Sequence, residues 1–220
     1  MKRVVWILPI LILTFLFSGC ETFTIRSSPE AFRSGRVLKE GETKVLTNST
    51  LISLIPMPGL EWSVTRGLPY NMEVTAGWGV HALVYAAGDD AENESDTYHG
   101  PEIFISKNLL NLNNIFYLAG TVGAEMNVIP VVDAAFHGGV DFGFYPIHWF
   151  TIFGHAKALY HTAGYFSPQL GLGFGFDSPF VLKIAAYTHL HEDMTELPDN
   201  TYFGPLYYGI QIGFRIKDSD

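Results

Sequence analysis

The chain has 220 residues, of which 48% are hydrophobic and only 16% charged, with a formal net charge of −9. Charged residues this sparse exclude an ordinary disordered chain, and the acidic balance argues against a nucleic-acid-binding protein, which needs clustered lysine and arginine. The single cysteine excludes a disulfide framework and a metal site of the CxxC type.

The first twenty residues have the composition of an export signal. A basic start at residues 1–3 is followed by an apolar run over 4–17 and by small residues up to Cys20. The run is shorter than the roughly 20 residues of a membrane-spanning helix, so we expect residues 1–19 to be a removable signal peptide.

The end of this segment, Leu16-Phe17-Ser18-Gly19-Cys20, resembles the lipobox of bacterial lipoproteins. The resemblance implies that the chain is cut before Cys20 and that a fatty acid such as palmitate is attached to the new N-terminus. Glu21, in place of the aspartate associated with inner-membrane retention, implies delivery to the outer membrane. A plain secretory signal with a chance cysteine is the alternative.

After a polar stretch over residues 20–41, which we expect to be a tether behind the lipidated N-terminus, apolar residues recur at every second position. This period is typical of strands and not of helices. The clearest example runs from Met72 to Ala86, where about 3.3 Å per residue gives a strand near 50 Å, far longer than usual in globular sheets. The same alternation predicts ten strands, with eight to twelve possible, at residues 42–53, 60–67, 72–86, 98–107, 115–127, 134–144, 150–163, 169–176, 180–190 and 206–216.

The lengths and faces of these strands favour a membrane barrel. Several reach the roughly 9–11 residues needed to cross a bilayer at a tilt, and one face is rich in Phe and Leu while the other carries Gly and ionisable residues. Connections at 67–71, 108–113, 145–149 and 177–179 are short, whereas those at 87–97 and 191–201 are longer and polar. We therefore predict an all-β fold, a closed antiparallel transmembrane β-barrel over 42–216 with a short polar tail at 217–220. Both ends of the chain are expected on the periplasmic side of the membrane, where the short turns lie.

The last strand, residues 207–214, resembles the C-terminal signal that the outer-membrane assembly machinery reads. Together with the lipobox, this makes the chain similar to small outer-membrane β-barrel proteins of Gram-negative bacteria. The resemblance implies a location in the bacterial outer membrane, with the N-terminus lipid-anchored on the periplasmic side. Outer-membrane lipids and the assembly machinery are the implied partners, and no nucleic acid, metal or cofactor is expected.

Ionisable and polar side chains on the inward face are expected to fill the lumen as a mixed-charge network, since barrels of about ten strands are narrow. A narrow pore for small solutes is the alternative. The residues expected to form this network are Glu61, Glu73, His81, Glu125, Asp141, His155, Lys157, His161, Lys183, His189 and Arg215, with Glu102 and His137 on the same face.

A catalytic role would depend on Asp141 and His155. These become diagonal cross-strand neighbours if Phe144 pairs with Phe150 across the intervening turn. A carboxylate that orients an imidazole is half of an acid–base pair, so an enzyme acting on membrane lipid or surface peptide stays an alternative. A lipid-anchored soluble barrel that binds a small hydrophobic ligand is another. The favoured prediction is a structural, adhesive or narrow-pore role without catalysis.

Overall fold

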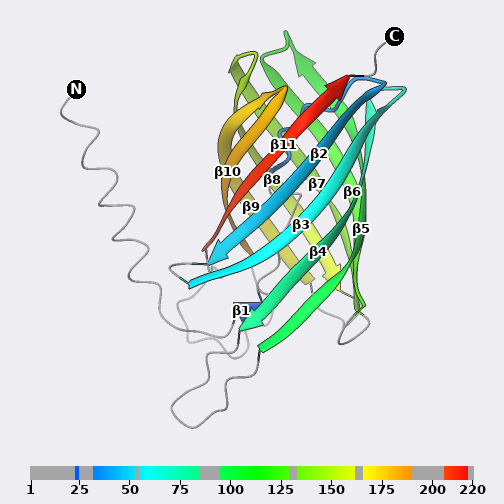
Figure 1. Ribbon diagram of the computed structural model, residues 1–220. Helices are drawn as coiled ribbons and strands as arrows, with labels where there is room; N and C mark the ends of the chain where they lie inside the picture. Colours follow the sequence, from blue (N-terminus) through cyan, green and yellow to red (C-terminus); the bar gives the residue numbers. More distant parts are fainter. Residues whose placement is uncertain are drawn as a thin grey trace, which may run out of the picture.

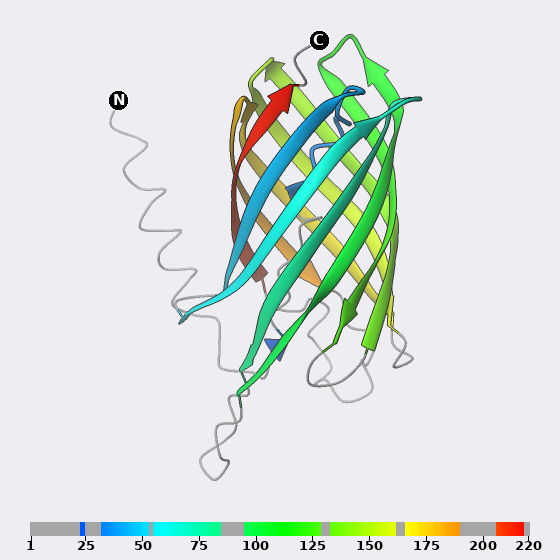
Figure 2. The same ribbon diagram turned by 45° about the vertical axis from the view of Figure 1, so that its right-hand side comes forward.

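The structure, a computed structural model, describes residues 23–24, 32–52, 55–84, 95–128, 133–161, 166–189 and 206–217. These residues form one sheet in which ten strands close into an antiparallel barrel (Figures 1 and 2). Each barrel strand pairs with the next along the chain, and the pairing of the last with the first, β11 with β2, closes the cylinder. The strands are β1 (Phe23–Thr24), β2 (Glu42–Ile52), β3 (Ile55–Leu68), β4 (Met72–Val84), β5 (Ser95–Leu112), β6 (Phe116–Asn127), β7 (Asp133–Ile147), β8 (Phe150–His161), β9 (Phe166–Ser178), β10 (Phe180–His189) and β11 (Leu206–Lys217).

All ten predicted barrel strands are present, and the two faces of the wall are those that the alternation predicted. Phe136 and Leu172 point outward, with 55% and 64% of their surfaces exposed, whereas Asp141 on the opposite face is 1% exposed. Small residues let the inward face accommodate large neighbours: a Cβ on Gly171 would lie 2.2 Å from the His155 ring. The barrel therefore turns its apolar side chains out and its polar ones in.

The four connections that were predicted to be short lie together at one end of the barrel. Two of them bend through consecutive residues with positive φ, Tyr70 and Asn71 in one and Asn113 and Asn114 in the other. Left-handed backbone of this kind fits the twist of a tight hairpin, and asparagine adopts it more readily than most residues. The C-terminal end of β11 lies on the same side (Figure 1).

Four strands, β3, β5, β7 and β9, are several residues longer than the alternation predicted, and in the first three irregular pairing hides the ends. The register shifts between Asn108 and Leu110 in β5 and between Phe144 and Ile147 in β7, so that apolar residues change phase before the strand stops. β3 begins at Ile55 instead of residue 60, and its prolines lie where its pairing with β2 is irregular. Proline is tolerated at such places because a ladder hydrogen bond is already missing there.

The structure differs most from the predicted domain organisation at the expected tether. Of residues 20–41, the structure describes 23–24 and 32–41, and the part from Phe32 to Leu38 lies inside the barrel, with both of these side chains almost wholly buried. We call residues 32–38 the lumenal segment. The chain leaves the lumen among the short turns, where Gly41 N donates to Gly67 O, and enters β2.

The N-terminal side of the described chain lies at the opposite end of the barrel. β1 pairs with the last residues of β4, Phe23 with Val84 and Thr24 with Leu83, at the end where the longer connections are (Figure 2). The prediction that both ends of the chain lie beside the short turns is thus wrong for the N-terminal side. The predicted signal peptide and Cys20 lie outside the described residues.

Candidate functional site

The lumen is where the structure gathers the ionisable side chains of the wall. Of the eleven residues predicted to line it, six are buried inside the barrel and two, Glu125 and Arg215, are partly exposed. For three histidines the side chains lie outside the described part of the structure. The six buried residues are Glu61, Glu73, Asp141, His155, Lys157 and Lys183, and the three histidines are His81, His161 and His189.

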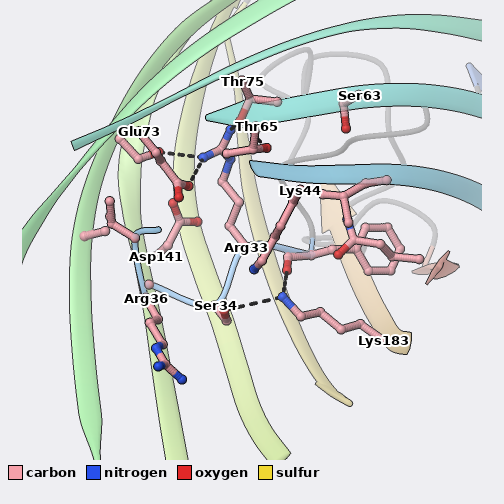
Figure 3. A pocket seen from close by; sticks show the side chains of 17 residues that line it. Arg33, Ser34, Arg36, Lys44, Ser63, Thr65, Glu73, Thr75, Asp141 and Lys183 are labelled. Atoms are coloured by element: carbon pink, nitrogen blue, oxygen red, sulfur yellow. Dashed lines mark hydrogen bonds and ion pairs between the residues drawn. The ribbon is translucent and has the colours of Figure 1, made fainter. Parts of the chain in front are cut away.

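The lumenal segment runs through the middle of these groups, and sequence reasoning missed it (Figure 3). Its sequence is FRSGRVL, in which two arginines stand among small and apolar residues inside an otherwise polar stretch. The apolar residues at its two ends were the available signal of burial, but the hydrophobic residues of the segment show neither the period of a strand nor that of a helix. The segment touches side chains from most of the wall, so that the wall and the segment form one site.

Asp177, near the short-turn end of β9, is the centre of the densest charge cluster. Lys44 Nζ lies 2.8 Å and Arg215 Nη2 3.0 Å from its Oδ1, and Lys183 Nζ lies 3.5 Å from its Oδ2. Asp177 is 1% exposed, and the cations come from the neighbouring strands β2, β10 and β11. The carboxylate attracts all three cations, and its loss would leave them buried close to one another without that balancing charge.

The lumenal segment joins this cluster through its serine. Ser34 Oγ donates to Asp177 Oδ2 at 3.2 Å and accepts a hydrogen bond from the Tyr145 hydroxyl at 2.7 Å. Lys183 Nζ donates to the carbonyl oxygen of Phe32 at 3.0 Å. The Asp177 cluster therefore fixes both a side chain and a backbone group of the segment.

Glu73 on β4 makes a second attachment across the lumen. One of its carboxylate oxygens lies 3.0 Å from Arg33 Nη1, and the other accepts a hydrogen bond from the backbone N–H of Leu38 at 2.8 Å. The same guanidinium donates to Thr75 Oγ1 and to Ser106 Oγ. A predicted lumen residue thus binds the segment instead of facing an open channel.

Asp141 and His155 are closer in register than predicted. They are directly opposite each other on β7 and β8, because Phe144 pairs with Ile152 and not with Phe150. The bulge near the turn causes this difference, as it adds residues to β7 that the assumed hairpin did not contain.

The Asp141 carboxylate is engaged by groups other than an imidazole. Thr121 Oγ1 donates to its Oδ2, and Lys157 Nζ lies 3.2 Å from its Oδ1. His155 is 2% exposed and packs over Gly171 of the next strand. This arrangement closes the wall of the barrel and leaves neither group open to a substrate from solvent.

Toward the end with the longer connections, the lumen is filled by amides, carboxylates and aromatic rings. Gln211 Nε2 donates to Asn48 Oδ1 at 2.8 Å, and Asn48 Nδ2 donates to Glu61 at 2.9 Å. On the opposite side of the lumen, His137 Nε2 lies 3.5 Å from a carboxylate oxygen of Glu125. The first two contacts link β11, β2 and β3 by hydrogen bonds, and the third places a histidine of β7 beside a carboxylate of β6.

Little space is left around the lumenal segment. The cavity there has a volume of about 40 Å³, enough for a few water molecules and for no larger solute. Within the described ranges, no three His, Cys, Asp or Glu side chains converge as a metal site would require. No helix in this part of the chain is long and apolar enough to cross a membrane.

Comparison with known proteins finds similarity among solved structures only. No family model matches the sequence, and no curated protein matches it. Among solved structures, the chain is similar to OmpT (in-vitro folded), an outer membrane protein of Vibrio cholerae, at 10% sequence identity and a TM-score of 0.36, over 86% of this chain and 71% of the other. A similarity at this level carries no argument about fold or activity.

Proposed function

We propose that the chain is an outer-membrane β-barrel protein that is closed at rest by its own N-terminal segment, with a structural or adhesive role. One observation carries the proposal: the barrel exposes apolar side chains around its circumference and buries ionisable ones. On β9, Leu172 and Phe174 are 64% and 53% exposed, whereas Gln169 and Asp177 are almost fully buried. Water-soluble proteins rarely expose continuous apolar surface on this scale, whereas acyl chains solvate it.

The dimensions of the wall support the same proposal. β9 has 13 residues, and at 3.3 Å per residue and a tilt near 40° it spans about 33 Å, close to the roughly 30 Å hydrocarbon core of a bilayer. Aromatic rings gather at the short-turn edge of the wall. The rings of Trp149 and Phe176 stack with their centres 5.6 Å apart, and Phe150 lies beside them. Aromatic side chains favour such membrane–water interfaces.

The filled lumen favours a closed barrel over an open pore. Barrels with an aqueous channel have about sixteen strands or more, and here the cavity beside the lumenal segment is only about 40 Å³. We therefore expect the purified full-length protein to insert into planar bilayers without steady conductance, and to migrate faster on a gel when unboiled. Steady conductance of the wild type would contradict the closed state, and solubility without detergent would contradict membrane insertion.

The two alternatives predict different behaviour. A soluble ligand-binding barrel needs an apolar interior, whereas ionisable groups line this one. A barrel enzyme would need Asp141 and His155, so His155→Ala in a folded protein would abolish a lipid- or peptide-cleaving activity. In a structural barrel the same substitution changes stability alone.

Two parts of the proposal concern attachment and assembly. We propose that Cys20 carries the lipid, which labelled palmitate tests: incorporation is expected in the wild type and is expected to be lost in Cys20→Ser. We also propose that the assembly machinery binds β11, whose outward face carries Ile212 and Phe214, 44% and 59% exposed. Outer-membrane lipids then solvate that face in the finished barrel.

A further inference from the structure

We infer that the lumen contains a peptide-binding site that the lumenal segment fills, and that release of this segment opens the barrel to ions. The inference rests on the proposed membrane barrel and adds a ligand class, an extended arginine-bearing peptide, to its interior. Figure 3 shows the segment surrounded by side chains of several strands. Four features of the contacts carry it.

The first feature is that the segment is held by side chains of the wall and not by the sheet. The ten strands complete their hydrogen-bond ladder with one another, from β2 round to β11. The described hydrogen bonds of the lumenal segment run instead to carboxylate, ammonium and hydroxyl groups of the wall and, from Arg36, to the carbonyl oxygen of His148 in a short turn. Departure of the segment therefore breaks no pairing between barrel strands and only the two-residue pairing of β1 with β4, which is the property of a bound ligand and not of a barrel strand.

The second feature is recognition of peptide backbone at both ends of the segment. Lys183 Nζ donates to the carbonyl oxygen of Phe32 at 3.0 Å, and Glu73 Oε2 accepts from the backbone N–H of Leu38 at 2.8 Å. A cation for a carbonyl and an anion for an N–H define the direction of a bound chain. They do so independently of its side chains.

The third feature is a site shaped for a guanidinium. Arg33 Nη1 contacts Glu73 Oε1 at 3.0 Å and Ser106 Oγ at 2.6 Å, and its Nη2 donates to Thr75 Oγ1 at 2.7 Å. The guanidinium carbon also lies 5.4 Å from the centre of the Phe104 ring. Several acceptors around one planar group, with a ring beside it, suit arginine, whereas lysine presents a single point of charge.

The fourth feature excludes side chains at one position and selects a second arginine beside it. Gly35 has a φ of +64°, and a Cβ there would lie 2.8 Å from the carbonyl oxygen of Asp141 and 2.9 Å from that of Tyr117. The next residue, Arg36, places its guanidinium 5.7 Å and 5.3 Å from the rings of Tyr117 and Tyr145. The wall thus selects the pattern Arg-x-Gly-Arg.

The size of the segment indicates what its departure would open. An extended chain occupies a cross-section of about 5 Å by 10 Å, the spacing of strands and of packed sheets. The uncovered wall carries Lys44, Lys183 and Arg215 facing Glu73, with Asp177 among the cations. Such a passage, lined by charges of both signs, would admit small hydrated ions.

The test uses the full-length chain, refolded and inserted into planar bilayers. Arg33→Ala removes the guanidinium contacts, and Gly35→Ala places a methyl group against backbone. We expect both variants to conduct for at least about tenfold more of the recording time than the wild type. The matched control is Gly138→Ala, since a Cβ at Gly138 meets nothing within 4 Å, and it should stay closed.

A synthetic peptide of residues 32–38 then tests the site itself. Added to either conducting variant, it should close the barrel, and the same peptide with lysine in place of Arg33 should not. Insertion of both variants without conductance, or conductance that the peptide leaves unchanged, overturns the inference. Failure of the variants alone to insert also overturns it, because the segment would then be needed for folding. Failure of the wild type to insert overturns the membrane proposal, and this inference with it.

Discussion

Arginine at the middle of the outward face gives a direct measure of what surrounds the barrel. Leu172 is the central residue of β9 and is 64% exposed. If acyl chains cover it, Leu172→Arg places a charge near the bilayer midplane at a cost of about 2–4 kcal/mol. That cost lowers the ratio of folded to unfolded protein by about 30-fold to 700-fold. If water covers it, the same substitution leaves the free energy of folding nearly unchanged.

The assay is a urea titration of folding into lipid vesicles, followed by the mobility of unboiled samples. Ile216→Arg is the matched control: Ile216 is 53% exposed but lies next to the end of β11, where arginine costs about 0–1 kcal/mol. We expect the central variant to lose far more stability than the terminal one. Equal free energies for wild type and Leu172→Arg, or folding of that variant without lipid or detergent, would refute the lipid-facing assignment.

Three further predictions address the charge cluster, the ends of the chain and assembly. Asp177→Asn should destabilise the barrel by about 3–5 kcal/mol in urea unfolding in detergent, because it leaves three cations buried without their carboxylate; a change below 1 kcal/mol would contradict the cluster's role. A peptide tag inserted before Phe23 should bind antibody on intact cells and a tag after Lys217 only on permeabilised cells, since long barrel connections face outward; the reverse pattern would show that β1 is misplaced. Phe214→Ala should lower the amount of assembled barrel in cells while refolding normally in vitro, whereas Phe174→Ala, on a similarly exposed site of β9, should assemble normally; equal assembly of both would exclude recognition of β11.

The strands of the barrel could be predicted because their signal is local. In β4 each inward residue, such as Glu73 or Thr75, is followed by an outward apolar one, and this alternation is set by the pleat of the strand alone. Strand ends were less predictable, because a bulge such as that after Phe144 changes the phase without leaving a mark in composition.

The lumenal segment could not be predicted, because its contacts join residues far apart in the sequence. Ser34 meets Asp177 at a separation of 143 residues, and Arg33 meets Glu73 at a separation of 40. Those partners become neighbours only once the cylinder is closed, and the segment has no periodicity of its own. Prediction of an ionisable lumen was therefore possible, whereas prediction of its occupant was not.

The seam of the barrel, where β11 pairs with β2, has a consequence for the order of assembly. The seam joins β2, whose chain emerges directly from the interior at Gly41, to β11, the last strand to be synthesised. The described chain is found at both mouths, with Phe23 and Thr24 at one and Glu42 at the other. We therefore expect the lumenal segment to lie against the unfinished sheet before β11 pairs with β2, because entry after closure would require the whole N-terminal part of the chain to pass through the lumen.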